Sequence, residues 1–464
     1  MPKDINQLRE EVVPIIVDLP VKMDKANDLI NIYNGEFLLK NKKCELHIDG
    51  KIEYQWFPYI GAVFTGLVLS ETGRSIKSEN ALDEYDLIID GLSSGNTFII
   101  ERTRPLGLSS TSKQKIKGIF TEYAVFNDSS ISVDSINFGI PNLRNFFGRT
   151  VRKKTKKSVF FSRSRVQFEN EEYKIVIDKT LDYHERIKNL DSKGGHLLLY
   201  SGRLSKRKDR LTLEESRVII DCFNEFLTFL NGRRVSTVFH TGILENNRVW
   251  SKYSNYSLDI YKSTCSWSIR NSTEGLNELF EKFSTLWKNK NDRNFLIFAV
   301  RWYEQANNNS NTEGLIENSI VIAQTALELI YNWLLIEKNR LLIGGDSEKI
   351  NAANKIRLLL SHLKINYSVP EGFNELKELI SSSNEYIDAP SILVLIRNSI
   401  VHSNIKKRKK ISALSIEIKY QALQLSIWYI EISLLYILGH KGKYYNRCSR
   451  ELYPIDREIN VPWI

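Results

Sequence analysis

The chain has 464 residues, of which 42% are hydrophobic and 26% are charged. These values are typical of a folded protein of two or three domains and exclude a wholly disordered chain. Lysine and arginine number 65 against 55 acidic residues, so the formal net charge is +10. This balance favours an anionic partner, with nucleic acid ahead of an anionic membrane surface.

Three features bear on the compartment. The chain has four cysteines, Cys44, Cys222, Cys265 and Cys448. None of them forms a Cys-x-x-Cys pair, which argues against a disulfide framework or a structural zinc site. The N-terminus carries acids and prolines where a signal peptide needs a cationic head and an apolar run. The most apolar long stretch, 420–439, includes Glu431 and is predicted to be a buried helix rather than a membrane span. We expect a cytoplasmic protein with no membrane contact.

The first predicted elements are short strands, rich in β-branched and aromatic residues and bounded by turn residues. They are GEFLLK (35–40), CELHIDGKIEYQWF (44–57), AVFTGLVLS (62–70), NTFIIERT (96–103), FTEYAVF (120–126) and EYKIVID (172–178). A helix is predicted over 211–232, with Thr212 as its N-cap and Gly232 as its stop. Three more strand-like segments follow: 234–242, 247–253 and 256–261. Residues 1–275 are therefore predicted to form a β-rich α+β region.

The pattern changes to apolar runs of helical length from about residue 276. These runs are 278–288, 294–306, 316–338, 350–363, 373–382, 388–402 and 411–439. Loop-forming residues separate them. We predict an all-helical bundle over 276–450 and a tail over 451–464, so that the whole chain is of the α+β class.

The segment LIRNSIVHSNIKKRKK, 395–410, has polar residues within an otherwise apolar predicted helix and ends in five consecutive basic residues, 406–410. Apolar side chains lie almost all round the helix over 389–402, which predicts that it is buried in its bundle or at an interface. Asn398 and His402 share a face. The side chains of Arg397 and His402 point roughly 140° apart around the helix axis. The two side chains of one chain therefore do not easily contact the same phosphate, whereas those of two chains facing each other across a dimer axis could.

The spacing Arg397-x4-His402, with Asn398 directly after the arginine, resembles the active motif of the HEPN ribonucleases. The resemblance covers residues 280–447 and implies a helical bundle that dimerises to make one composite site and cleaves RNA without a metal or other cofactor. The histidine would move a proton, the arginine would stabilise the phosphate, and Asn398 would orient the histidine or hold a phosphate oxygen. The alternative is that Arg397 and His402 form a structural network with a buried carboxylate.

Glu328 lies on a polar stripe with Gln324 and Asn332 along an otherwise apolar helix. It resembles an acidic residue that HEPN bundles often carry on an earlier core helix, where it could form a bidentate ion pair with Arg397. Equally, the stripe could face water.

Three basic segments are candidates for RNA contact. The first, predicted to be a solvated loop that holds phosphates beside the motif, consists of Lys406, Lys407, Arg408, Lys409 and Lys410. The second, 149–165, is either an RNA contact or a flexible loop, and includes Arg152, Lys153, Lys154, Lys156 and Lys157. The third, 203–210, is predicted to be a solvated loop.

A metal-dependent nuclease is a weaker reading. Glu172 and Lys174 have the Glu-x-Lys spacing of such cores, but the required upstream acid has no clear candidate beyond Asp134. We expect no metal site.

The order of a β-rich region followed by a helical bundle resembles the ApeA-type HEPN proteins of anti-phage defence. That resemblance implies a metal-independent endoribonuclease that acts by abortive infection, with RNA as substrate (tRNA being one candidate). It also implies that the N-terminal region, 1–275, either senses a phage-derived trigger or binds the substrate. The competing hypothesis is a non-catalytic HEPN module that binds nucleotides or RNA.

Overall fold

The computed structural model describes residues 12–73, 83–103, 114–154, 156, 158–269, 272–308, 313–382, 387–402 and 404–464. The chain divides into two compact units. Unit 1 comprises Met1–Asp221 and Val235–Lys262, and unit 2 comprises Cys222–Arg234 and Ser263–Ile464. The long helix α3 (Leu213–Asn231) therefore contributes its first half to unit 1 and its second half to unit 2.

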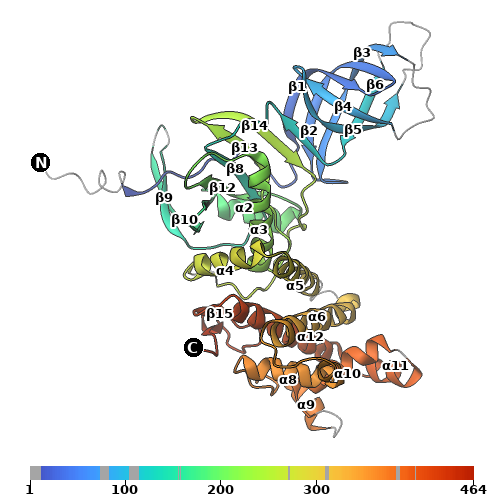
Figure 1. Cartoon of the computed structure of the whole chain (residues 1–464), viewed down its shortest axis with the longest axis vertical. Coiled ribbons are helices and arrows are strands. Elements are labelled where there is room, and N and C mark those ends of the chain that lie inside the picture. The colour runs from blue at the N-terminus through green and yellow to red at the C-terminus, as the bar shows by residue number, and fades with distance from the viewer. Residues whose placement is uncertain are drawn as a thin grey trace, which may run out of the picture. The chain divides into compact units, whose positions relative to one another are not determined.

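Unit 1 begins with a closed barrel of antiparallel strands (Figure 1). The strands are β1 (Ile30–Lys40), β2 (Cys44–Gln55), β3 (Gly61–Gly73), β4 (Glu84–Ile89), β5 (Leu92–Thr103) and β6 (Lys115–Phe120). Their order is β1-β2-β3-β6-β5-β4, and β4 pairs with β1 to close the barrel. Alternate side chains point inward, as Tyr85, Leu87 and Ile89 do on β4, because successive residues of a strand face opposite sides.

The rest of unit 1 is an antiparallel sheet in the order β7-β14-β13-β8-β12-β11-β10-β9. Its strands are β7 (Tyr123–Phe126), β8 (Ser135–Pro141), β9 (Arg149–Lys154), β10 (Val159–Glu169), β11 (Tyr173–Lys179), β12 (Leu198–Lys206), β13 (Val238–Leu244) and β14 (Asn247–Ser254). Helix α2 (Tyr183–Lys193) lies between β11 and β12 in the chain. The N-terminal segment runs along β9, where Ile15 forms a parallel bridge with Arg152.

The predicted β-rich fold of the N-terminal half is confirmed, with corrections in detail. The predicted helix is α3, and the Thr212 hydroxyl accepts the Glu215 backbone N–H at 3.2 Å, as an N-cap does. The predicted strand over 256–261 is wrong, because those residues have no regular secondary structure. The predicted loop over 203–210 is wrong in its first half, which continues β12 to Lys206.

Unit 2 is largely helical, as predicted. Its helices are α4 (Leu276–Lys288), α5 (Lys290–Asn308), α6 (Ile316–Tyr331) continuing as a π-helix (Asn332–Lys338), α7 (Asp346–Lys349), α8 (Ala352–His362), α9 (Asn374–Ser381), α10 (Ala389–Val401), α11 (Ile405–Ser412) and α12 (Ile416–Ile437). Helix α12 is buried on nearly every side, which confirms the prediction of a core helix there. It packs on α5, α6 and α9.

The prediction of an entirely helical bundle is wrong at its end. A two-stranded sheet forms from β15 (Lys443–Tyr445) and β16 (Glu458–Asn460). Between these strands, Arg447 reaches back into the core and forms two hydrogen bonds with Glu431 of α12, at 2.8 and 2.6 Å. The polar groups on α12 therefore fix the chain terminus to the bundle.

Candidate functional site

The motif helix α10 begins at a tightly bonded N-cap. The Asp388 carboxylate accepts the Ser391 backbone N–H at 3.0 Å, and the Ser391 hydroxyl accepts the Asp388 backbone N–H at 3.0 Å. Arg357 of α8 forms a bidentate ion pair with the same carboxylate, at 2.6 and 2.8 Å. Burial alone would raise the pKa of Asp388, but the bonds from Arg357 and Ser391 outweigh it and lower that pKa. These contacts fix where α10 starts and hold it against α8.

Helix α10 is less buried than its sequence predicts. One face packs into the unit through Ile392, Leu393, Ile396 and Ser399. Val394, Leu395 and Ile400 are only half-buried, and Val401 is 44% exposed. The expectation of a helix buried all round within its own bundle is therefore wrong for the single chain, which leaves an apolar strip at the end of α10 accessible.

The motif residues lie at that accessible end. Arg397 and Asn398 are half-buried, and the Arg397 Nη1 donates to Asn398 Oδ1 at 3.0 Å. His402 is the C-cap of α10 and is exposed; its backbone N–H donates to the Asn398 carbonyl at 3.0 Å. Its ring makes no hydrogen bond with any residue that the structure describes. The structure thus joins Arg397 to Asn398 directly and Asn398 to His402 through the backbone.

Glu328, on α6, is exposed and forms no ion pair with Arg397 among the described residues, so the expected bidentate contact is absent from the single chain. Both groups nevertheless act on Tyr331 of α6. Burial raises the pKa of the Tyr331 hydroxyl, Glu328 raises it further, and Arg397 lowers it. The glutamate and the arginine therefore both lie near Tyr331, although they form no ion pair with each other.

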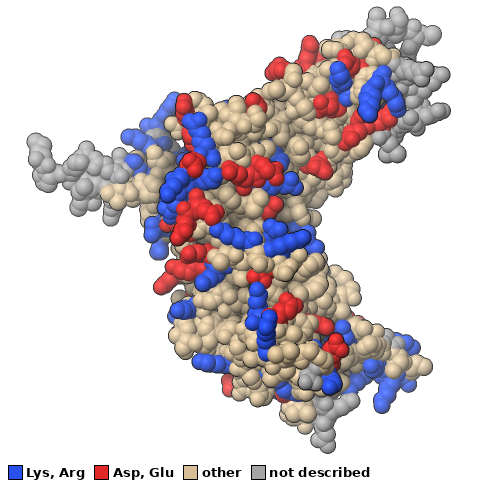
Figure 2. All heavy atoms as spheres, viewed as in Figure 1, with Lys and Arg blue, Asp and Glu red and all other residues tan. Residues whose placement is uncertain are grey.

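The run of cations after the motif is a helix, so the prediction of a loop is wrong. Helix α11 is capped by Asn404, whose side chain accepts the Lys407 backbone N–H at 3.0 Å. Its buried residue is Ile411. The five cations differ in exposure: Lys406, Arg408 and Lys409 are exposed, whereas Lys407 and Lys410 are half-buried. Figure 2 shows basic side chains gathered at the end of unit 2, where Figure 1 places α11.

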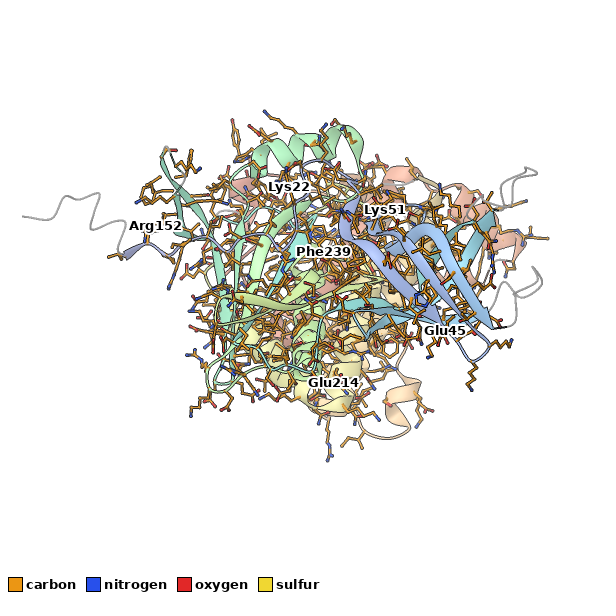
Figure 3. All side chains as sticks on the ribbon, turned by 90° about the horizontal axis from the view of Figure 1, so that it is seen from above. Lys22, Glu45, Lys51, Arg152, Glu214 and Phe239 are labelled. Atoms are coloured by element: carbon orange, nitrogen blue, oxygen red, sulfur yellow. The ribbon has the colours of Figure 1, made fainter. Side chains whose placement is uncertain are left out.

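The segment 149–165 contains two paired strands, β9 and the first part of β10, so its described strand residues do not form a loop. Strands β9 and β10 pair as a hairpin on which Figure 3 labels Arg152. Two of the predicted RNA-binding cations have partners within the chain. The Arg152 Nε donates to the Val13 carbonyl at 2.9 Å, and the Lys153 Nζ lies 3.1 Å from an Asp18 carboxylate oxygen. Lys154 and Lys156 are exposed, and Lys157 lies outside the described residues.

The residues of the metal-dependent alternative are not assembled. Asp134 accepts hydrogen bonds from the Arg210 side chain at 3.1 Å and from the Glu245 backbone at 2.8 Å. Across the described parts of the chain, no group of three or more His, Cys, Asp and Glu side chains has the geometry to hold a metal ion.

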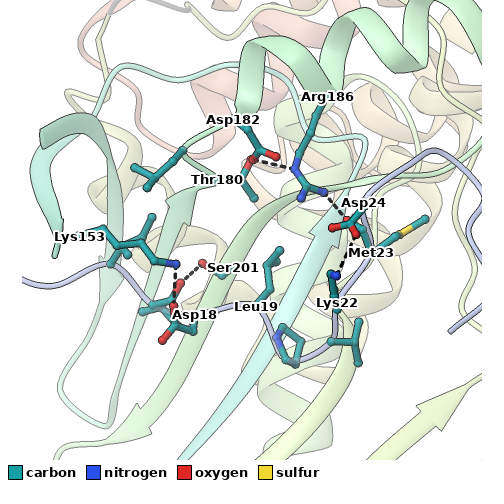
Figure 4. A pocket seen from close by; sticks show the side chains of 15 residues that line it. Asp18, Leu19, Lys22, Met23, Asp24, Lys153, Thr180, Asp182, Arg186 and Ser201 are labelled. Atoms are coloured by element: carbon teal, nitrogen blue, oxygen red, sulfur yellow. Dashed lines mark hydrogen bonds and ion pairs between the residues drawn. The ribbon is translucent and has the colours of Figure 1, made fainter. Parts of the chain in front are cut away.

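A pocket of about 380 Å³ lies between the segment 16–24 and the β11, α2 and β12 region of unit 1 (Figure 4). Its charged groups are mostly paired. Arg186 donates to Asp182 at 2.8 Å and to the Met23 carbonyl at 2.8 Å, and Lys153 pairs with Asp18. Such a mixed lining does not indicate one class of ligand. No sequence pattern pointed to this pocket, because its walls come from distant parts of the chain.

The buried ion pair between Glu431 and Arg447 is the strongest electrostatic feature that sequence reasoning missed. Their side chains are 0% and 2% exposed. Glu431 also accepts the Tyr303 hydroxyl at 2.6 Å, and Arg447 donates to Gln424 at 2.9 Å. Burial alone would lower the pKa of Arg447, but Glu431 raises it well above its usual value. Because every partner is enclosed, this cluster is structural and not a site for substrate.

Comparisons with known proteins follow the same division of the chain. Residues 128–264 match the YopA central domain, and residues 289–456 match the YopA C-terminal domain. The chain belongs to the YopA family. A curated relative is the SPbeta prophage-derived uncharacterized protein YopA of Bacillus subtilis (strain 168), which is 26% identical over 444 residues, 94% of this chain and 95% of that protein. No solved structure matches the chain.

The YopA C-terminal domain contains α10, α11 and the whole Arg397 to His402 motif, whereas the barrel lies outside both matched domains. The same domain contains a stretch, Ile316–Lys338, that is long and apolar enough to cross a membrane. In the structure 61% of the apolar 18-residue window within that stretch is buried, as in a core helix.

Proposed function

We propose that this YopA family chain is a metal-independent endoribonuclease of the HEPN type that acts in anti-phage defence. The observation that carries the proposal is the joined set Arg397, Asn398 and His402 at the accessible end of α10, directly followed by the basic helix α11. An arginine, a histidine with a solvent-accessible ring and a cationic surface are what phosphodiester cleavage without a metal needs.

In the proposed reaction the nucleophile is the 2′-hydroxyl of the RNA itself. That oxygen attacks the adjacent phosphorus while the bond to the 5′-oxygen of the next nucleotide breaks. The products are a 2′,3′-cyclic phosphate and a 5′-hydroxyl. His402 takes the proton from the nucleophile or gives one to the leaving oxygen, and Arg397 stabilises the charge that develops on the phosphoryl oxygens. Asn398 holds the Arg397 guanidinium in place.

The site is completed by a second copy of the chain. The accessible strip of α10 ends in Val401, 44% exposed, and the next helix begins with Ile405, 67% exposed. Burying these apolar groups between two copies would bring two motifs together across the symmetry axis. It would also supply the missing half of a site in which Arg397 and the His402 ring do not meet within one copy.

In this proposal the protein is cytoplasmic, its substrate is RNA (tRNA is one candidate), and α11 and the β9–β10 hairpin hold the phosphates. The region over 1–275 receives a phage-derived trigger. The name of the Bacillus relative, which describes it as prophage-derived, fits a role in competition between phages.

A non-catalytic HEPN module that binds nucleotides or RNA is the second candidate. It is favoured by the His402 ring, which has no hydrogen-bond partner to orient it among the described residues, and by the exposed Glu328. Overexpression separates the two. The nuclease should arrest growth, and His402→Ala or Arg397→Ala should each abolish the arrest.

Matched controls are His47→Ala, an exposed histidine of the barrel, and Arg301→Ala, an exposed arginine of α5. Both should leave the arrest intact. Growth arrest that survives His402→Ala, or no arrest by the wild type when RNA binding is intact, would favour the binding module.

A further inference from the structure

The β9–β10 hairpin carries two neighbouring phenylalanines on its outer strand pair. Phe160 is 49% exposed and Phe161 is 47% exposed. Neither ring lies against another aromatic ring among the residues that the structure describes. Large apolar side chains that are exposed side by side often mark a binding surface for a ligand, a protein or a membrane.

The register of the hairpin pairs each ring with a cation. Phe160 lies opposite Lys153, and Phe161 lies opposite Arg152. Since successive residues of a strand face opposite sides, the two rings lie on the two faces of the hairpin. Phe160 shares its face with Val151, which is fully buried, so it continues the core face of the sheet beyond the point where the core ends.

The other face is the more open of the two. Phe161 shares it with the exposed Arg163 on the same strand, and with Lys154 on β9. The whole sequence from 149 to 165 contains no acidic residue. The acids that do approach it come from elsewhere: Asp18 pairs with Lys153, and Asp178 pairs with Arg165. Lys154, Lys156 and Arg163 form no ion pair among the described residues.

Positive charge continues beneath the hairpin. Lys179 on β11 is 5% exposed and has no carboxylate partner in the described structure; its Nζ donates to Asn145 at 2.7 Å. Burial and the nearby Arg163 lower the pKa of Lys179 to about 8. A polyanion is therefore the complementary partner, because it would add negative charge where the chain supplies almost none.

We infer that the β9–β10 hairpin binds single-stranded RNA. Phe161 is a stacking platform for an unpaired base on the face that carries Lys154 and Arg163, Phe160 is a second platform on the opposite face, and Lys154, Lys156 and Arg163 are phosphate contacts. Exposed rings beside cations are how proteins hold single strands without reading their sequence. A duplex keeps its base faces covered by stacking, so it can use the cations but not the rings. The inference rests on the proposed function in that RNA is the substrate, and it assigns unpaired RNA as the substrate class.

The test is equilibrium binding in the full chain carrying His402→Ala, so that the RNA stays intact. Fluorescence anisotropy compares a labelled single-stranded oligonucleotide with a duplex of the same sequence. Replacing both rings (Phe160→Ala with Phe161→Ala) should weaken binding of the single strand at least tenfold, since each stacked base contributes on the order of 1–3 kcal/mol, and should leave the duplex unchanged. The pair Phe160→Trp with Phe161→Trp should retain binding, and its thermal unfolding shows whether the hairpin still folds.

The salt dependence of RNA affinity distinguishes the contribution of the two rings from that of the three cations. The alanine pair should lower the affinity without changing the slope of log affinity against log salt, because no phosphate contact is lost. The variant with Lys154→Gln, Lys156→Gln and Arg163→Gln should instead make the slope shallower by about 2 units, at roughly 0.7 per contact. The control, Leu92→Ala with Ile100→Ala, removes two apolar residues of the barrel that are similarly exposed and should change neither quantity.

Two results would overturn the inference. One is unchanged single-strand affinity in the alanine pair. The other is binding of the wild type to vesicles containing anionic lipid that the alanine pair loses while its RNA affinity is unchanged, which would make the hairpin a membrane contact. Because the assay measures binding in a chain that cannot cleave, its outcome does not depend on whether the wild type is a nuclease.

Discussion

Replacing the three exposed cations of α11 should weaken RNA binding and leave the fold unchanged. The variant carries Lys406→Gln, Arg408→Gln and Lys409→Gln. Glutamine is chosen because it is uncharged and nearly as good a helix former as lysine or arginine, so α11 should persist. Lys407 and Lys410 stay, since they are half-buried beside the rest of the unit.

The magnitude follows from the helical geometry of α11. Residues of a helix point in directions 100° apart, so five consecutive cations cannot all face one RNA strand. The three exposed ones mark the side that is open to a ligand. Each phosphate contact to a single strand contributes about 0.7 to the slope of log affinity against log salt, so three contacts contribute about 2 units. In a solvated loop all five cations could contact phosphates, and removing all five would then change the slope by about 3.5 units.

The assay is RNA binding between 50 and 300 mM salt in the His402→Ala background. The matched control removes the same charge from the barrel, with Lys42→Gln, Lys115→Gln and Lys117→Gln. We expect a shallower slope in the α11 variant alone. An unchanged slope would show that these three cations of α11 do not contact the RNA backbone.

Three further predictions concern the fold and the assembly. Arg447→Met should lower the free energy of unfolding by about 3–5 kcal/mol in a denaturant titration, because it leaves the Glu431 charge enclosed without its partner; an effect below about 1 kcal/mol would show that the pair is open to water. Asp388→Ala should lower the free energy of unfolding by about 1–2 kcal/mol at pH 7. Because the pKa of Asp388 is lowered in the folded state, the full difference between variant and wild type should be present above about pH 4 and should shrink as the pH falls below that value. A difference that grows in acid would contradict the assignment. Val401→Asp with Ile405→Asp should yield monomers that have lost nuclease activity in sedimentation and cleavage assays, and a fully active monomer would refute the composite site.

The sequence predicted the fold class and most elements, because their signals are local. Richness in β-branched and aromatic residues identified strands such as β2, and the run from Thr212 to Gly232 identified α3 through its cap and its stop. Strands β9 and β10 were missed because cations outnumber the β-branched and aromatic residues over 149–165, so the sequence alone favoured a loop as much as a binding surface. The helix α11 was missed for the same reason.

The motif could be found from spacing, but its surroundings could not. Neither the hydrogen bond between Arg397 and Asn398 nor the absence of an Arg397 to Glu328 ion pair could be predicted from spacing, because the first depends on side-chain conformation and the second on how α6 and α10 pack. The ion pair of Glu431 and Arg447 joins a core helix to the chain terminus, and no periodicity relates two residues in that way. Long-range packing therefore decided what local patterns left open.

The most direct test of the central claim is the mapping of RNA ends after incubation of total RNA with the purified chain in EDTA. The account predicts new 2′,3′-cyclic phosphate ends with the wild type and with His47→Ala, and none with His402→Ala or Arg397→Ala. Cleavage that requires Mg²⁺ or Mn²⁺, or that persists unchanged in His402→Ala, would contradict it.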